Sequence, residues 1–206
     1  MKKLVLLILL ALTGVITWYF WETKPKPDNE TPQLQTVVVS QHSDSFNTSI
    51  TSVLNNYYAL SEALVNWDSA TVTMHANALR SSLNNVNFNE LKKDTTISKR
   101  AESFIQGSQK QIELIAKPTA SLHEKRLSFN QLSNEMYNLM RTIKYDASKI
   151  YLQECPMAFN DNESGIWLSK KEDIRNPYLG LHHPKYGKGM LECGETKDTL
   201  NFIQTQ

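Results

Sequence analysis

The sequence predicts a mainly α-helical protein, an antiparallel four-helix bundle with a small, loop-rich C-terminal cap that contains two short strands. Three observations carry this prediction. Apolar residues recur at helical spacing in four segments between residues 45 and 143, and the connections between these segments are short. After Tyr145 the pattern changes to short apolar runs bounded by Gly, Pro, Asn and Asp. Amphipathic helices joined by short loops pack as antiparallel neighbours.

Residues 1–21 are predicted to enter a membrane. An almost unbroken apolar run over residues 4–20 follows two lysines and ends in four aromatic residues, 18–21, which suit a membrane interface. No small-x-small cleavage motif follows, so we expect an uncleaved anchor, with a cleaved signal peptide as the alternative. Residues 22–42 then form a polar, proline-rich linker, and residues 43–206 form the folded part outside the cytoplasm.

The first helix begins near Ser45, and the second begins after Asp68, which is a suitable N-cap residue. The turn between them is very short, so the two helices should form an antiparallel hairpin. The predicted buried positions are Phe46, Ile50, Val53, Leu54, Tyr57, Leu60 and Leu64 in the first helix, and Val72, Ala76, Leu79, Leu83 and Val86 in the second.

An asparagine-rich stretch over residues 84–94 interrupts the helical period before the third helix, which Pro118 ends. Ser121-Leu-His-Glu124 resembles a capping box and starts the fourth helix. The predicted buried positions are Ile97, Ala101, Phe104, Ile105, Ser108, Ile112 and Ile115, followed by Leu132, Met136, Leu139, Met140 and Ile143. The two short strands of the cap are expected at residues 149–153 and 166–168.

Charge and motifs exclude several classes of function. The net charge of +1 comes from 22 basic and 21 acidic residues that are interspersed, so no basic surface for nucleic acid is expected. The chain contains no Gly-x-Ser-x-Gly, no His-Glu-x-x-His, no phosphate-binding glycine loop and no dinucleotide-binding fingerprint. We therefore expect neither an enzyme nor a nucleic-acid partner.

Each of the two cysteines has a methionine neighbour, in Cys155-Pro-Met157 and in Met190-Leu-Glu-Cys193. Thiolate and thioether sulfur are soft ligands that select soft ions, above all Cu(I). The adjacent histidines of the same segment add two further donors. The sequence therefore predicts a site for Cu(I) or a similar soft metal ion made of Cys155, Met157, Met190, Cys193, His182 and His183.

A disulfide between Cys155 and Cys193 is the alternative interpretation, because a protein outside the cytoplasm is exposed to oxidising conditions. Closing a loop of this length would stabilise the fold by about 4 kcal/mol in the chain-entropy model. This interpretation leaves Met157 and Met190 as packing residues. The residues alone leave both interpretations open.

Several segments resemble domain-of-unknown-function family 3347. The C-terminal motifs are Tyr151-Leu-Gln-Glu-Cys-Pro-Met-Ala158, Gly165-Ile-Trp-Leu-Ser169, Ile174-Arg-Asn-Pro-Tyr-Leu-Gly180 and Met190-Leu-Glu-Cys-Gly194, and the helical ones are Tyr57-Tyr-Ala-Leu-Ser-Glu-Ala-Leu64 and Phe129-Asn-Gln-Leu-Ser133. The resemblance implies a secreted or membrane-attached protein without enzymatic activity. The same domain is appended to periplasmic adaptors of heavy-metal efflux pumps, which implies such an adaptor as a partner.

Cys155-Pro-Met157 is also similar to the start of the heavy-metal-binding domain of such adaptors, although Ala158 stands where that motif has histidine. Residues 181–188 look like an insertion relative to family 3347, which either supplies His182 or His183 as a replacement ligand or loosens the site. The expected function is that of a membrane-tethered, periplasmic or otherwise extracytoplasmic protein that binds Cu(I) for sequestration or transfer to an efflux system. The alternative is a structural or protein-interaction module with a Cys155–Cys193 disulfide and no metal.

Overall fold

The computed structural model describes residues 17–18 and 40–204. The chain divides into two compact units, residues 1–36 and 37–206, and the fold described below belongs to the second. The predicted membrane segment therefore lies outside the described residues, except for residues 17 and 18. Within the described ranges, no helix is both long enough and apolar enough to cross a bilayer.

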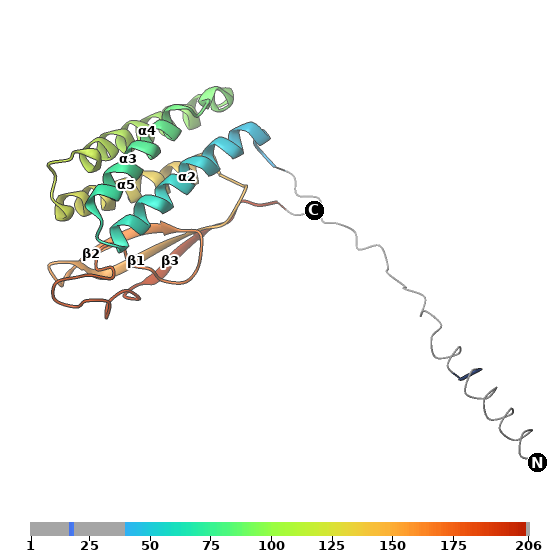
Figure 1. Cartoon of the computed structure of the whole chain (residues 1–206). Coiled ribbons are helices and arrows are strands. Elements are labelled where there is room, and N and C mark those ends of the chain that lie inside the picture. The colour runs from blue at the N-terminus through green and yellow to red at the C-terminus, as the bar shows by residue number, and fades with distance from the viewer. Residues whose placement is uncertain (1–16, 19–39, 205–206) are drawn as a thin grey trace, which may run out of the picture. The chain divides into compact units, whose positions relative to one another are not determined.

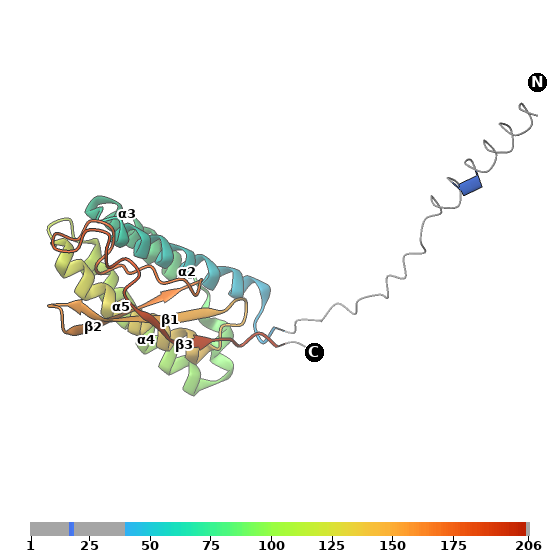
Figure 2. The same cartoon turned by 90° about the horizontal axis from the view of Figure 1, so that it is seen from below.

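The second unit is mainly helical and carries a small antiparallel sheet in its C-terminal part (Figure 1). Its elements are α2 (Asp44–Val65), α3 (Ser69–Asn84), the 3-10 helix η1 (Phe88–Lys93), α4 (Thr95–Ala116), α5 (Leu122–Ile143), β1 (Ile150–Phe159), β2 (Glu163–Ser169) and β3 (Glu195–Leu200). Along the chain α2 packs on α3, α3 on α4 and α4 on α5, while α5 and α2 contact β2. Figure 2 shows the helices and the sheet from below.

The helices begin where the sequence places their caps. The Asp68 side chain accepts a hydrogen bond from the Thr71 backbone N–H at 3.0 Å. Ser121 and Glu124 form the predicted capping box, in which each side chain accepts from the other residue's backbone N–H. The asparagine-rich stretch between α3 and α4 is not irregular, because it contains η1, and Asp94 caps α4 by accepting from Thr96 and Ile97.

The cap contains three strands in the order β2-β1-β3, where the sequence predicts two. β1 also extends to Phe159, so Cys155-Pro-Met157 lies within a strand and not in a turn. Pro156 does not break the ladder because the pairing of β1 with β2 shifts between Cys155 and Phe159. β3 escapes sequence prediction because its residues, Glu195-Thr-Lys-Asp-Thr-Leu200, show no apolar alternation.

The outer edge of β2 is covered by side chains of the helices. The Ile166 N–H donates to Oδ1 of Asn130 in α5 at 2.9 Å, and the Leu168 N–H donates to the hydroxyl of Tyr57 in α2 at 3.1 Å. The hydroxyl of Tyr57 also lies 2.6 Å from that of Ser133. These bonds join the helical layer to the sheet and satisfy backbone groups that a free strand edge would expose.

Arg126, in the first turns of α5, joins the cap to the ends of other elements. Arg126 is 5% exposed, and its guanidinium donates to the Pro177 carbonyl oxygen at 3.0 Å and to the Leu64 carbonyl oxygen at 2.9 Å. It lies 3.9 Å from the centroid of the Trp67 ring, a cation–π distance. Burial lowers the pKa of Arg126 to about 10, so the side chain stays charged at neutral pH.

The part of the β2–β3 connection around Gly180 contacts the turn between α2 and α3. The Leu181 N–H donates to the Val65 carbonyl oxygen at 2.9 Å, and the Trp67 indole N–H donates to the Leu179 carbonyl oxygen at 3.0 Å. Gly180 has φ of +58°, and a Cβ there would collide with the Val65 carbonyl oxygen. Three segments therefore meet here: the α2–α3 turn, the start of α5 and the β2–β3 connection. The hydrogen bonds between them are accepted by the backbone carbonyl oxygens of Leu64, Val65, Pro177 and Leu179.

We predict that Arg126→Met lowers the free energy of unfolding by about 2–4 kcal/mol, because two buried carbonyl groups lose a charged donor. Urea unfolding of the variant measures the loss. Arg100→Met is the matched control, since Arg100 is exposed on α4 and its replacement should change stability by less than about 0.5 kcal/mol. Equal midpoints for the two variants would contradict the role given to Arg126.

Candidate functional site

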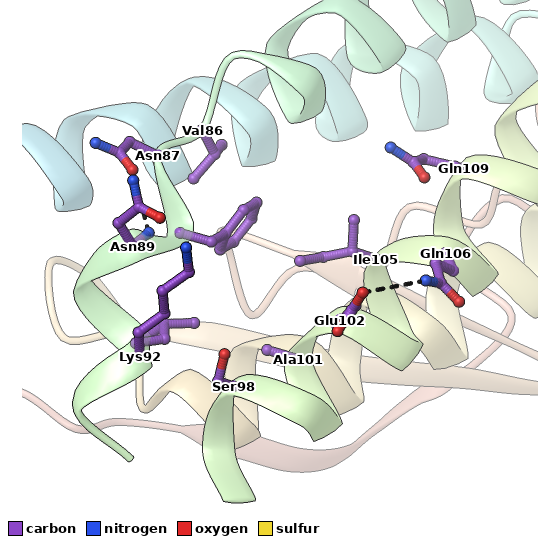
Figure 3. A pocket seen from close by; sticks show the side chains of 12 residues that line it. Val86, Asn87, Asn89, Lys92, Ser98, Ala101, Glu102, Ile105, Gln106 and Gln109 are labelled. Carbon is purple, nitrogen blue, oxygen red and sulfur yellow. Dashed lines mark hydrogen bonds between the residues drawn. The ribbon is translucent and has the colours of Figure 1, made fainter. Parts of the chain in front are cut away.

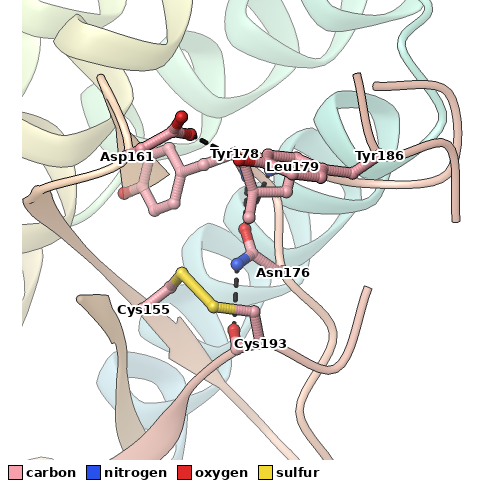
Figure 4. The surroundings of a disulfide bond; sticks show 7 residues. All are labelled: Cys155, Asp161, Asn176, Tyr178, Leu179, Tyr186 and Cys193. Carbon is pink, nitrogen blue, oxygen red and sulfur yellow. Dashed lines mark hydrogen bonds between the residues drawn. A yellow bond between two sulfur atoms is a disulfide. The ribbon is translucent and has the colours of Figure 1, made fainter. Parts of the chain in front are cut away.

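Cys155 and Cys193 form a disulfide between β1 and the residues that precede β3 (Figure 4). Their Cα atoms are 5.6 Å apart, and the residues are separated by 38 positions in the sequence. Cys155 is fully buried, whereas Cys193 is half-buried. The bond ties the end of the long β2–β3 connection to the central strand of the sheet.

The register of the sheet positions Cys155. Cys155 pairs with Gly165, and Gln153 pairs with Trp167, so these four residues share one face of the sheet. A Cβ on Gly165 would lie 2.7 Å from the Cβ of Ala158 and 2.8 Å from the Tyr178 ring. Glycine is therefore needed here because the neighbouring side chains fill the space above the strand.

Asn176 positions Cys193. The buried Asn176 side chain donates to the Cys193 carbonyl oxygen at 2.9 Å, and its Oδ1 accepts from the backbone N–H groups of Tyr178 at 2.8 Å and Leu179 at 3.0 Å (Figure 4). The Asn176 N–H donates to the Leu191 carbonyl oxygen at 2.9 Å. Sequence reasoning did not select Asn176, although the Asn-Pro dipeptide is a turn signal that could have identified it.

Gln153 fixes the beginning of the same connection. Its side-chain amide is buried and donates to the carbonyl oxygens of Lys171 at 3.1 Å and Glu172 at 2.9 Å. At the other end, Gly194 has φ of +141°, and a Cβ there would lie 2.7 Å from the Glu154 carbonyl oxygen. The connection is thus held at both ends by contacts to β1, and the disulfide lies beside the second of them.

The two predicted methionine ligands are partly buried and pack against the hydrophobic core. Met157 lies on β1 two residues after Cys155, and the Met190 carbonyl oxygen accepts from the Cys193 N–H at 3.1 Å. Both methionines therefore lie close in sequence to a sulfur of the disulfide. Their thioether sulfurs have no polar role among the contacts of the described residues.

The two predicted histidine ligands differ in their surroundings. His182 is exposed, whereas the His183 ring packs against the rings of Trp67 and Tyr186, at centroid distances of 5.5 and 5.0 Å. Nδ1 of His183 accepts from the backbone N–H groups of Lys185 at 3.2 Å and Tyr186 at 3.3 Å. Burial, reinforced by the charge of Arg126, lowers the pKa of His183 and favours the neutral ring. His183 thus organises its own loop.

The donor set in this state does not suit a soft metal ion. The thiolate is the metal-binding form of cysteine, and both sulfurs are joined to each other. Across the described part of the chain, no group of three or more His, Cys, Asp and Glu side chains could hold a metal ion. A metal site at Cys155 and Cys193 therefore requires the reduced protein, and the metal role of the six selected residues stays a prediction.

We predict that replacing both cysteines by alanine lowers the free energy of unfolding by about 4 kcal/mol, because the unfolded chain loses a cross-link over a loop of this length. Urea unfolding with and without a thiol reductant provides an internal control. The reductant should destabilise the wild-type protein by a similar amount and leave the double alanine variant unchanged. If the urea midpoint of the wild-type protein is the same with and without reductant, and mass measurement verifies complete reduction, the prediction is contradicted.

Of the comparisons with known proteins, the one with family models gives a match. Neither the curated proteins nor the solved structures contain a significant match to this chain. A family model matches residues 53–148, from the middle of α2 to just before β1. The resemblance expected from the helical motifs is confirmed, whereas the C-terminal motifs, with the disulfide, lie beyond the matched residues. Residues 53–148 therefore match the family described as "Protein of unknown function (DUF3347)".

Proposed function

We propose that the protein is a membrane-tethered, extracytoplasmic interaction module without enzymatic activity, in which an antiparallel four-helix bundle carries a cap locked by the Cys155–Cys193 disulfide. The disulfide is the observation that carries this proposal. Disulfides form and persist outside the cytoplasm and are rare within it. The apolar run at residues 4–20 supports a membrane tether, and it lies outside the described residues apart from residues 17 and 18.

The contacts of two histidines support a non-enzymatic role. Both ring nitrogens of His42 have partners, Glu90 Oε1 at 2.9 Å and the Ile143 carbonyl oxygen at 2.6 Å. His183 caps its own turn through Nδ1. These imidazoles hold loops and helix ends, and neither is paired with a nucleophile as a general base would be.

The form of the cap supports an interaction role. The β2–β3 connection has little regular secondary structure, yet Gln153, Asn176 and the disulfide fix it at both ends. Its turn is held to the β1–β2 turn, since Lys185 Nζ and the Tyr186 hydroxyl both donate to Asp161, at 2.5 and 2.8 Å. A loop fixed in this way offers a preorganised surface, which lowers the entropy lost when a partner binds.

We predict that the protein isolated from its native cells is membrane-bound and fully oxidised at Cys155 and Cys193. Trapping free thiols with a maleimide before lysis, followed by mass measurement with and without reductant, checks the redox state, and fractionation checks the membrane. A Cys155→Ser, Cys193→Ser variant is the control that should show no mass shift in either condition. Free thiols in a soluble wild-type fraction would contradict both the extracytoplasmic location and the disulfide that locks the cap.

The proximity of the two cysteines favours one second candidate function, binding of Cu(I) or a similar soft ion by the reduced protein, for sequestration or delivery to a heavy-metal efflux adaptor. The Cα separation of 5.6 Å, measured in the disulfide, would place two thiolates together after reduction. Met157 and Met190, each close in sequence to one cysteine, are the thioethers that would complete the ligand set.

We predict that reduced protein binds Cu(I) in competition with a chelator, and that oxidised protein does not. Met157→Leu and Met190→Leu should each weaken binding about tenfold, or about 1.4 kcal/mol, because leucine keeps the volume and removes the thioether. Met74→Leu is the matched control, since Met74 is exposed on α3. Equal affinities for all three variants would remove the methionines from the site, and no binding by reduced wild-type protein would end the metal proposal.

A further inference from the structure

A crevice between α2 and the beginning of β1 is lined by hydroxyl groups. Its volume is about 370 Å³, and the hydroxyl-bearing side chains around it are those of Thr51, Tyr58, Tyr145, Ser148 and Tyr151. No carboxylate lines it, although the protein as a whole has nearly as many acidic residues as basic ones. Hydroxyl groups without a neighbouring carboxylate are suited to receive an anion.

The register of the sheet brings two lysines to the same crevice. Tyr151 pairs with Ser169, so Lys149, two residues before Tyr151, and Lys170, one residue after Ser169, lie at the same end of the β1–β2 ladder. Both line the crevice, and in the described part of the molecule neither forms an ion pair. Their charges are therefore available to a ligand.

The hydroxyl of Tyr58 is a buried donor without a partner among the described residues. A second phenol of the crevice, that of Tyr145, has a partner: Thr51 donates to the Asn47 carbonyl oxygen at 2.7 Å and can therefore accept from the Tyr145 hydroxyl, 2.7 Å away. Burial raises the pKa of Tyr58, so its proton stays in place. An acceptor supplied by a ligand would remove the cost of leaving this buried donor unpaired.

A larger cleft adjoins the crevice at Tyr58 and Lys170. Its volume is about 750 Å³, and Val65, Ile174 and Leu191 form apolar parts of its wall. Its charged residues are of both signs: the carboxylates of Glu62, Asp173 and Glu192, and the cations of Lys170, Lys171 and Arg175. The charges of the cleft balance, whereas the crevice has Lys149 and Lys170 and no carboxylate in its lining. The charged head of an amphipathic ligand is therefore favoured in the crevice and its apolar part in the cleft.

We propose that the crevice binds the oxyanion head, carboxylate or phosphate, of an amphipathic ligand whose apolar part occupies the adjoining cleft. The Tyr58 hydroxyl donates to the head group, and Lys149 and Lys170 supply its counter-charge. The site shares no residue with the disulfide and does not depend on the function proposed for it.

Calorimetric titration with decanoate, decyl phosphate and uncharged decanol tests the proposal on the oxidised protein. We expect saturable binding of at least one of the two anions, at least tenfold tighter than binding of decanol. If only one anion binds, that result identifies the head group and supports the site. No saturable binding of either anion, or equal affinities for anion and decanol, would overturn it.

Two variants test the residues. Tyr58→Phe should weaken anion binding about tenfold without lowering the urea midpoint, because it deletes an unpaired hydroxyl and keeps the ring. Lys149→Ala with Lys170→Ala should weaken binding and reduce its dependence on salt. Lys92→Ala, on η1, is the control and should bind like the wild-type protein. Wild-type affinity in both the Tyr58 and the double lysine variants would place the ligand elsewhere and refute the proposal.

Discussion

The fold depends on two adjacent cations that have no carboxylate partner among the described residues. Arg126 donates to the end of α2 and to the β2–β3 connection, as described above. Lys125 is fully buried, and its Nζ donates to the carbonyl oxygens of Ile115 at 2.7 Å and Lys117 at 3.0 Å, at the end of α4. Positive charge is favourable at helix C-termini, where carbonyl groups lack intrahelical partners. Two adjacent residues in the first turns of α5 thus donate hydrogen bonds to the C-terminal carbonyl groups of α4 and α2.

A second pocket, between η1 and α4, shows how the two sides of the helical layer differ (Figure 3). Val86, Ala101 and Ile105 are among its apolar lining residues, and its polar lining combines amides with both Lys92 and Glu102. Charges of both signs and side-chain amides leave this pocket without a preferred ligand charge. The hydroxyl-lined crevice on the other side has a single sign of charge, and this difference makes it the stronger candidate for a ligand site.

The helices were predictable because their buried stripes repeat at helical spacing and because Asp68 and Ser121 are strong caps. β1 was predicted too short, since Cys-Pro-Met resembles a turn until the shift in pairing that accommodates Pro156 is known. The cysteines could be selected from their spacing, but whether they bind each other or a metal depends on oxidation. Gln153 could not be selected, and the Asn-Pro signal marks Asn176 only as a turn residue, because the contacts of both side chains arise only when the β2–β3 connection lies over the sheet.

The hydroxyl-lined crevice was outside the reach of sequence reasoning for a similar reason. Tyr58, Lys149 and Lys170 come from three separate segments, and each alone is an ordinary surface or interface residue. Only the pairing of Tyr151 with Ser169 places the two lysines at one end of the ladder. A site assembled by register in this way has no local motif, so it becomes visible only with the tertiary structure.

The side chains at the two edges of the sheet affect how neighbouring molecules can associate. On one edge, Asn130 and Tyr57 accept hydrogen bonds from the N–H groups of Ile166 and Leu168 in β2; on the other, β3 exposes Glu195, Lys197 and Asp198. Side chains of the helices cover the β2 edge, and charged side chains on β3 disfavour pairing with a strand from a neighbouring molecule. A neighbouring copy therefore meets helix side chains at one edge and charged side chains at the other, which disfavours pairing between the sheets of two molecules.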